Sequence, residues 1–281
     1  MFRALLVLLF AFPLAAQEHI EVRVLDVGQA DAVLIQHQGR AMLYDAGDRG
    51  SPAASRLMEL GIDTLDLLVA SHPHADHIGG MAAVLDSLVV LAYADPGTDH
   101  TTVTFSELQQ SLENAGLDRS FPDSLGGAEI RWLHPPADST HWGLNDLSLG
   151  LYLTLGDGSV SLAGDAEEVL WDYWVARDQV FPVTAHKSSH HGSHNGDTRE
   201  AIERLRPEIV FIGVGEGNRY GHPRDEVLQL YEDESAVVLR TDHHGEVIIE
   251  INERGEYRYW TETGPCQDPV PCYPRWPWPI R

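Results

Sequence analysis

The sequence predicts an α/β fold in which two β-sheets pack face to face and helices cover their outer sides. Two observations carry this prediction. Apolar runs of strand length, bounded by glycines, occur in both halves of the chain, and amphipathic stretches of helical length lie between them. With 281 residues and 43% hydrophobic content the chain can bury a full core, and we expect one domain over residues 17–262.

The N-terminus has the layout of a secretory signal peptide over residues 1–16. Arg3 precedes an apolar run that reaches Phe12, and small residues stand at positions 15 and 16. We expect cleavage after Ala16 and a periplasmic or extracellular protein with no membrane span left. Leu14 stands where a small residue is usual before the cut, so the alternatives are an uncleaved anchor and a lipid-free N-terminal stem.

The first half of the chain opens with three short strands and then alternates strands with helices. A helix over 51–61 is expected from Ser51 as its cap, Pro52 in its first turn and Gly61 as its stop. The strands are expected at 19–28, 31–39, 41–47, 65–71 and 89–94, and further helices at 79–88 and 105–116.

The second half is richer in strands. A hairpin is expected over 147–165, with glycines at 156 and 158 around its turn. Other strands are expected at 128–135, 181–187, 208–215, 235–242, 245–251 and 256–262, and helices at 166–178, 197–207 and 224–233.

Residues 263–281 are too rich in proline for regular structure and are expected to form a tail on the surface. Cys266 and Cys272 would form a disulfide in an oxidising compartment, with two unpaired thiols as the alternative. Trp276 and Trp278 are expected to pack back onto the domain rather than bind a carbohydrate or wall surface.

A cluster of metal-ligand side chains stands in SHPHADH, residues 71–77. His72 and His74 are two apart, so in an extended segment they point to the same side, and Asp76 and His77 follow where a helix begins. Imidazole nitrogens with a carboxylate and no cysteine suit zinc, manganese or iron. A solvated loop would need neither the apolar strand before the cluster nor the two glycines after it.

Further candidate ligands follow other expected strands. Asp165 ends the strand of SVSLAGD and could bridge two metal ions, although it could also cap the next helix. The segment AHKSSHHGSHNG supplies His190 and His191, of which one is expected to be a ligand and the other a hydrogen-bonding or solvated neighbour. His186 and His194 are expected to be peripheral.

These motifs resemble the metallo-β-lactamase superfamily, whose signature H-x-H-x-D-H is matched without gaps. More narrowly, the chain is similar to the hydrolase domain of the competence protein ComEC. The resembling segments, spread over most of residues 20–250, are VLDVGQADAVLIQ, YDAG, SHPHADHIGG, NDLSLGLYL, LAGD, HKSSHHGS and NRYGHPRDEVL. The resemblance implies an αβ/βα sandwich of two mixed β-sheets with outer helices and two divalent metal ions, Zn or Mn, between the sheets.

The resemblance also implies a ligand set: His72 and His74 for one metal, Asp76, His77 and His190 for the other, and Asp165 between them. The third histidine typical of the first site has no counterpart, and Asn145, Asp146 or a water would complete it. Asp26 and Asp45 are expected to orient ligand histidines or to pack. Because ComEC is a large membrane protein and we expect this domain to stand alone, a role in DNA uptake is not expected to carry over.

A two-metal centre activates water and stabilises the attacking and leaving oxygens of a displacement, so we expect a metal-activated hydroxide to attack phosphorus. The expected activity is that of a phosphodiesterase, or more narrowly a nuclease. Asp76 would orient the nucleophile and accept its proton. His222 would stabilise charge or protonate the leaving oxygen, unless it is a structural turn histidine, and Asn218 and Lys187 would contact substrate phosphate.

The formal charge of −24 limits the substrate, because affinity for a phosphate backbone comes mainly from Lys and Arg. DNA remains a candidate substrate only if the metals and a local basic patch outweigh the global field. The candidates for that patch are Lys187, Arg199, Arg219 and Arg224. The alternatives are a hydrolase of another small or wall-linked ester or of a lactam, and a non-catalytic metal-binding module for adhesion.

Overall fold

The computed structural model describes residues 18–139 and 141–263. The expected signal peptide, the Cys266 and Cys272 pair and the tail beyond Thr263 lie outside the described residues. No helix in the described ranges is long and apolar enough to cross a membrane.

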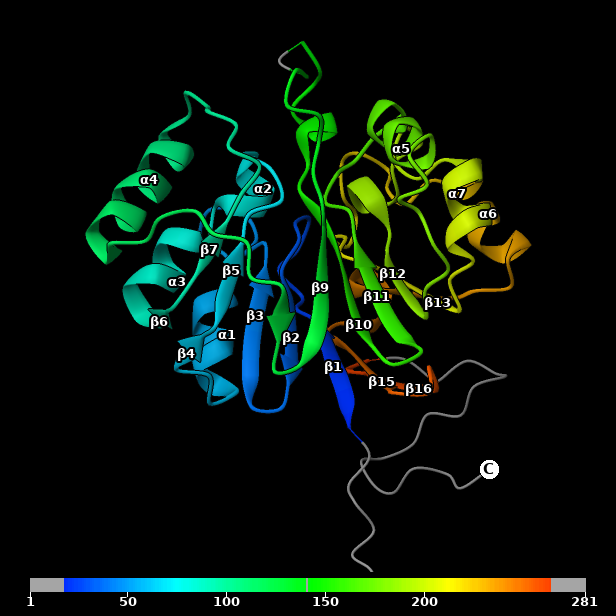
Figure 1. Ribbon diagram of the computed structural model, residues 1–281, viewed down its shortest axis with the longest axis horizontal. Helices are drawn as coiled ribbons and strands as arrows, with labels where there is room; N and C mark the ends of the chain where they lie inside the picture. Colours follow the sequence, from blue (N-terminus) through cyan, green and yellow to red (C-terminus); the bar gives the residue numbers. More distant parts are fainter. Residues whose placement is uncertain (1–17, 140, 264–281) are drawn as a thin grey trace, which may run out of the picture.

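Two seven-stranded sheets form the centre of the molecule (Figure 1). The first has the order β16-β15-β1-β2-β3-β5-β7 and consists of β1 (His19–Val24), β2 (Val33–His37), β3 (Arg40–Tyr44), β5 (Leu67–Val69), β7 (Tyr93–Ala94), β15 (Val247–Asn252) and β16 (Tyr257–Thr261). The second has the order β14-β13-β12-β11-β10-β9-β8 and consists of β8 (Ser124–Leu125), β9 (Ala128–Leu133), β10 (Gly150–Leu155), β11 (Gly158–Leu162), β12 (Ala185–Lys187), β13 (Ile209–Ile212) and β14 (Val237–Arg240).

Both sheets are mixed. The strands β3, β5 and β7 run parallel in the first sheet, and β11 to β14 run parallel in the second, whereas the remaining pairs are antiparallel. The parallel strands end at loops that carry the candidate ligands, so this half of each sheet positions the site. A separate two-stranded sheet pairs β4 (Thr64–Leu65) with β6 (Val89–Val90).

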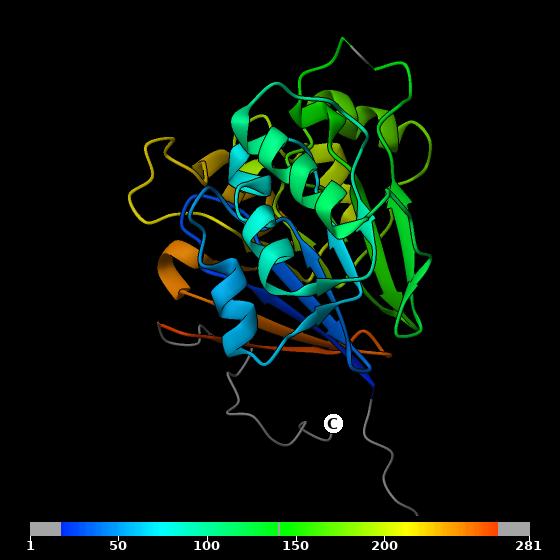
Figure 2. The ribbon, with the colours of Figure 1, turned by 90° about the vertical axis from the view of Figure 1, so that its left-hand side faces the viewer.

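Helices cover the outer face of each sheet. The first sheet carries α1 (Ala53–Glu59), α3 (Met81–Ser87) and α4 (Val103–Ala115), which face the viewer in Figure 2. The second carries α5 (Glu168–Val175), α6 (Arg199–Leu205) and α7 (Asp225–Asp233). Short turns at strand ends complete the order: α2 (Ala75–Ile78), α8 (Thr241–His244) and the 3₁₀ turns η1 (Asn145–Leu147) and η2 (Ser189–Gly192). The predicted αβ/βα sandwich is confirmed.

Alternating side chains build the core in layers. In β2, Val33 and Ile35 face the other sheet while Leu34 faces the helices, as the two-residue period of a strand requires. One apolar cluster therefore fills the space between the sheets, and two more lie between each sheet and its helices. The sandwich is held rigidly enough to carry a site on loops at its edge.

Two local expectations were wrong. The run 89–94 is not one strand, because Val89 and Val90 pair with β4 and only Tyr93 and Ala94 join the first sheet. The helix α1 starts after Pro52 as its N-cap rather than after Ser51, although the Ser51 hydroxyl still accepts from the N–H of Ala53 at 3.2 Å.

Candidate metal centre

The expected ligands lie on loops that leave the carboxyl ends of parallel strands. The segment 72–77 follows β5, Asp165 follows β11, and His190 and His191 follow β12. The loops of the two sheets are joined, because the N–H of Leu149 donates to the carbonyl of Ser71 at 2.8 Å. Side chains from both sheets therefore meet at one edge of the sandwich.

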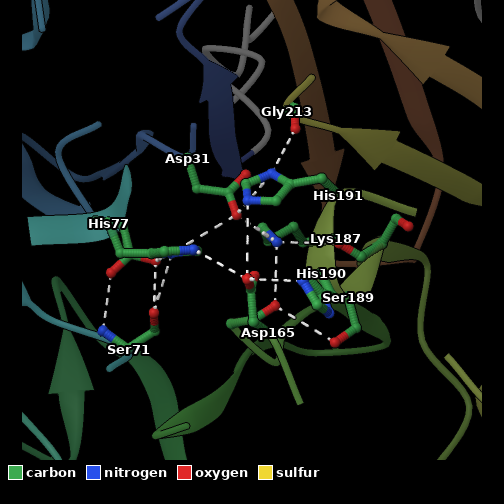
Figure 3. A network of polar contacts seen from close by, with 12 residues as sticks. Asp31, Ser71, His77, Asp165, Lys187, Ser189, His190, His191 and Gly213 are labelled. Carbon is green, nitrogen blue, oxygen red and sulfur yellow. Dashed lines mark hydrogen bonds and ion pairs between the residues drawn. The ribbon is translucent and has the colours of Figure 1, made fainter. Parts of the chain in front are cut away.

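Four side chains converge there on one point. The Nε2 atom of His77 lies 3.2 Å from Asp165 Oδ2, and the Nε2 atom of His191 lies 3.8 Å from the same oxygen. Asp76 Oδ2 lies 3.5 Å from His191 Nε2 and 4.0 Å from His77 Nε2. Figure 3 shows His77, Asp165 and His191 directed toward this point. These three side chains are buried, whereas Asp76 is 34% exposed and so opens the cluster to solvent.

The hydrogen bonds behind the rings fix which nitrogen faces the point. His77 Nδ1 donates to Asp45 Oδ2 at 2.8 Å, and His191 Nδ1 donates to the carbonyl of Gly213 at 2.7 Å. Because a carboxylate and a carbonyl can only accept, each Nδ1 carries a proton, and Nε2 is the nitrogen left to bind a metal once its own proton is displaced. Asp45 therefore orients a candidate ligand, as expected, and also accepts from the N–H and hydroxyl of Ser71.

The donor set fits a divalent cation. His77 Nε2, His191 Nε2 and Asp165 Oδ1 are buried and have no hydrogen-bond partner within the described part of the chain. Burying such atoms without partners is unfavourable, and a cation that accepts their lone pairs removes the penalty. Two imidazoles and two carboxylates suit zinc or manganese equally.

The first half of the expected centre consists of His72 and His74. His72 Nε2 and His74 Nδ1 face each other at 2.9 Å, with the ring planes at 80°. Burial and the charge on His77 lower the pKa of His72 well below its ordinary value, and burial also lowers that of His74. Both imidazoles are therefore neutral, which is the form that binds a metal.

The second half of the expected centre consists of Asp76, His77, Asp165 and His191. Without a metal, protons on its two histidines balance the negative charge of the carboxylates. Burial alone would lower the pKa of His77, but neighbouring carboxylates, Asp165 first among them, raise it well above its ordinary value. Burial likewise opposes the charge of His191, yet Asp31 and Asp165 raise its pKa to about 9. A bound divalent cation would displace these protons and take over the neutralisation of the carboxylates.

The two candidates for the missing ligand have different surroundings. Asp146 Oδ1 accepts from the N–H groups of Glu167 and Leu170, each at 3.1 Å, so this oxygen caps α5. Asn145 donates through Nδ2 to Glu167 Oε1 at 2.6 Å, and its Oδ1 is buried without a hydrogen-bond partner among the described residues.

Backbone conformation decides between the paired histidines. His190 and His191 both have positive φ, 48° and 53°, and Gly192 continues the run at 75°. This uncommon turn sends His191 inward, while His190 stays 21% exposed with its Nδ1 3.2 Å from Glu167 Oε1. The geometry therefore favours His191 as the ligand over His190, which the family resemblance implied and whose Nε2 lies 3.8 Å from Asp165 Oδ2 at the rim.

His186 supports the loop that carries these histidines. Its Nε2 lies 3.1 Å from Asp197 Oδ1, and Asp197 Oδ2 accepts from the N–H of Ser189 at 3.1 Å and from the Tyr231 hydroxyl at 2.5 Å. His186 is thus outside the centre, as expected. The network fixes the start of η2 from behind.

His222 stands beside the rim. Its ring centroid is 5.8 Å from that of His190 and stacks on Tyr220 at 5.6 Å. Burial, together with the charges of His190 and His191, lowers the pKa of His222 to about 4. His222 is therefore neutral near pH 7 and can offer a hydrogen bond but not an imidazolium proton.

The structure gives the two side chains expected at the substrate phosphate other partners. Asn218 uses both ends of its amide on backbone, since Nδ2 donates to the carbonyl of His222 at 2.7 Å and Oδ1 accepts from the N–H of His222 at 3.0 Å. Asn218 therefore stabilises the loop to which it belongs. Lys187 is completely buried, with its ammonium 2.6 Å from Asp31 Oδ2, so it offers no exposed charge to a substrate.

Asp31 is the residue that the sequence did not reveal. Its Oδ2 lies 3.8 Å from His77 Nδ1 and 3.6 Å from His191 Nδ1. These are the proton-bearing nitrogens, so Asp31 lies behind the rings and is not a ligand, although it belongs to the same buried cluster. The sequence points to a role for Asp31 only through its position in the family-like segment VLDVGQADAVLIQ. The exposed Asp26 of the same segment accepts from the N–H of Gly28 and orients no histidine.

A family model for the metallo-beta-lactamase superfamily matches residues 25–214, which include every loop of this centre. The chain belongs to the metallo-β-lactamase superfamily. The predicted resemblance to ComEC-like proteins is also confirmed by its relatives. This superfamily member is 29% identical over 290 residues to ComE operon protein 3 of Bacillus subtilis, covering 92% of the chain and 35% of the relative. It is 28% identical over 246 residues to Recombination protein 2 of Haemophilus influenzae, covering 82% and 28%.

The chain thus spans about a third of the length of these curated relatives. Among solved structures, the metallo-β-lactamase fold protein YhfI from Bacillus subtilis matches with a TM-score of 0.52 at 12% identity, over 79% of this chain and 95% of that one. The likeness shows a shared fold. Family and site together identify a hydrolase of the metallo-β-lactamase superfamily with a buried Asp/His cluster able to hold divalent metal.

Proposed function

We propose that this hydrolase is a metal-dependent phosphodiesterase, with DNA as its candidate polymeric substrate. The observation that supports the proposal is the convergence of His77, Asp165 and His191 with their ligand atoms free, beside the partly exposed carboxylate of Asp76. Two divalent ions at such a site lower the pKa of a bound water and neutralise charge on a transferring phosphoryl group.

Asp76 is the residue that we assign to proton transfer. Burial alone would raise its pKa, but His77 and His191 lower it below its ordinary value, so the carboxylate is ionised at neutral pH. It is also the most exposed member of the cluster. A carboxylate in this position can orient the attacking water and accept its proton.

We assign His222 to contact with the substrate. Its loop is tied to the loop of His191, because the N–H of Arg224 donates to the carbonyl of Gly192 at 2.9 Å. As a neutral imidazole it would donate a hydrogen bond to a phosphoryl oxygen. The protonation of the leaving oxygen suggested by the sequence is disfavoured by its low pKa.

Exposed cations near the candidate site bear on a phosphodiester substrate, because the overall charge is −24. Of the four cations considered for a basic patch, Lys187 is buried and Arg199 pairs with Asp233 at 2.9 Å. Arg219 and Arg224 remain exposed on the loop of His222. They are two positive charges that a single strand or a short phosphodiester could use, on a segment that also exposes Glu216, Asp225 and Glu226.

DNA is proposed because of the relatives, one of which is named for recombination. We also propose that the protein acts outside the cytoplasmic membrane, on the strength of the signal-like residues 1–16. Fractionation of cells that express the full chain, followed by mass spectrometry of its N-terminus, tests this location. A cytoplasmic protein that keeps Met1 would refute it.

The activity is tested by hydrolysis of bis(p-nitrophenyl) phosphate and of labelled single- and double-stranded DNA, with zinc or manganese. Asp76→Ala should lose metal-dependent turnover, whereas Asp86→Ala, which removes an exposed carboxylate on α3, should keep it. A lactam and a carboxylic ester are assayed in parallel. Two bound metals without turnover of any phosphodiester would overturn the proposal, and turnover of a parallel substrate would name the replacement.

A further inference from the structure

The sequence contains a single lysine among its 281 residues, against eighteen arginines. That lysine, Lys187, is 0% exposed. An enclosed ammonium is unfavourable unless acceptors surround it and an opposite charge pairs with it. The chain therefore uses arginine at every other basic position and lysine only where the charge is shut inside the fold.

The surroundings of Lys187 explain the choice of residue. Its ammonium lies 2.6 Å from Asp31 Oδ2 and donates to the carbonyls of Gly164 at 3.1 Å and Ser188 at 3.0 Å. Three protons thus meet three acceptors. A compact ammonium can satisfy this arrangement, whereas the planar fork of a guanidinium directs its five N–H groups differently and needs more space.

Two of the three acceptors belong to chain segments that carry ligands of the second metal half-site, and the third is hydrogen-bonded to the segment of Asp76 and His77. Gly164 immediately precedes Asp165, and Ser188 leads into the turn that presents His191. Asp31 belongs to the first sheet's side, where its N–H donates to the carbonyl of Asp76 at 3.1 Å. One side chain therefore connects loops from both sheets directly beneath the ligands, as Figure 3 shows for Lys187, Asp31 and Asp165.

The backbone leaves room for this connection. A Cβ atom on Gly213 would overlap Asp31 Oδ1, so the absence of a side chain there lets the carboxylate lie against β13 and its following loop. The carbonyl of the same Gly213 accepts from His191 Nδ1. The position of Asp31 and the orientation of His191 are thus set by one residue.

We propose that Lys187 and Asp31 form a permanent ionic cross-link under the metal centre, which holds the ligand-bearing loops of the two sheets at the spacing that metal binding requires. Lys187 is a positioning residue: it acts through the backbone of Gly164 and Ser188 and through Asp31. The cross-link concerns metal binding, so it does not depend on which ester the enzyme cleaves.

The effect of removing the ammonium distinguishes this role from a purely electrostatic one. Coulomb repulsion from a buried positive charge weakens the binding of divalent cations, so its removal alone would tighten binding. If Lys187 instead sets the spacing of the loops, Lys187→Met lowers metal affinity. We expect a loss of about 10–100-fold, the range found when groups that support metal ligands are removed.

Metal affinity is measured by competition with a chromophoric chelator, and stoichiometry by elemental analysis after dialysis. Arg224→Met is the matched control, because it removes one positive charge from the neighbouring exposed loop and leaves the cross-link intact. Unchanged or tighter metal binding in Lys187→Met would overturn the proposal.

Asp31→Asn should reproduce the loss, and the double variant Asp31→Asn/Lys187→Met should be no worse than either single variant, because both break the same connection. Additive losses would show that the two residues act independently and would overturn the cross-link.

The unmodified protein provides a test that does not require a variant to fold. An amine acylating reagent has two kinds of target in the folded chain, the α-amino group and Lys187. We expect complete labelling of the α-amino group and none of Lys187, with and without a chelator, until denaturant is added. Labelling of Lys187 in the folded protein at the rate of the α-amino group would contradict its enclosure, and labelling that appears only after metal removal would show that the cross-link is not permanent.

Discussion

The substitution Asp45→Asn tests whether the proton on His77 is held where a metal ligand needs it. Asp45 is completely buried and accepts three hydrogen bonds: Ser71 N–H at 2.8 Å on Oδ1, and Ser71 hydroxyl at 2.7 Å and His77 Nδ1 at 2.8 Å on Oδ2. An asparagine has one accepting oxygen and one donating NH₂ group. Its NH₂ cannot occupy the Oδ1 position, because the N–H of Ser71 also donates there.

The NH₂ group must therefore take the Oδ2 position and donate to His77 Nδ1. The ring proton then moves to Nε2, the atom that faces Asp165, and the lone pair for the metal is lost. Asn tolerates the backbone at position 45, where φ is 58°, so the backbone adds little to the effect. We expect metal affinity to fall by about 10–100-fold, or about 1.4–2.8 kcal/mol.

The assay is chelator competition at pH 7 with zinc and with manganese, with thermal unfolding of the metal-free protein alongside. Asp86→Asn, the same substitution at an exposed position on α3, is the control. If Asp45→Asn binds two metals as tightly as the unchanged protein, the argument from the hydrogen-bond acceptors of Asp45 fails.

Three further substitutions test the assignments at the centre. His191→Ala should lose one metal per chain in elemental analysis while His190→Ala keeps both, and the reverse result would restore the sequence-based choice. Asp146→Ala should keep the metals but lower stability by about 1 kcal/mol, or about 2–4 °C in Tm, through loss of the α5 cap. Burial alone would raise the pKa of Asp197, but His186 and the other partners of this carboxylate lower it below its ordinary value. The ionised Asp197 therefore stabilises the folded protein above pH about 4, and this contribution is lost as the pH falls through the pKa of Asp197 in the folded state. Asp197→Asn should therefore flatten the acid limb of urea-unfolding stability, and an unchanged limb would count against the network.

The sequence predicts those parts of the centre that depend only on the secondary structure of neighbouring residues. Segment 71–77 needs only an extended stretch followed by a helix, and the structure has both. Asp165 required one more step, the rule that parallel strands end at the same edge of a sheet. The choice between His190 and His191 was beyond such reasoning, because adjacent residues of one type differ only through backbone dihedral angles.

Other differences between the sequence-based predictions and the structure arise from contacts that the sequence does not show. Lys187 near the motifs of a phosphoesterase suggests a phosphate contact, and only the fold shows that Asp31, from the first strands of the chain, meets its ammonium. Asn218 was misinterpreted for a different reason. Its amide is fully used within its own loop, a local alternative that short polar side chains often adopt and that spacing does not reveal.

The two halves of the centre differ in how completely the chain prepares them. In the second half, Asp45 and Gly213 hold both imidazoles in the ligand tautomer, and the cross-link beneath them holds the loops. In the first half, His72 Nδ1 has only the Ser71 hydroxyl at 3.1 Å, which can donate or accept and so does not select a tautomer. Preorganised ligands bind more tightly because less order must be imposed on binding. A first equivalent of metal should therefore fill the second half, and phosphodiesterase turnover should rise only with the second equivalent, since activation of the attacking water and stabilisation of the leaving oxygen need both ions.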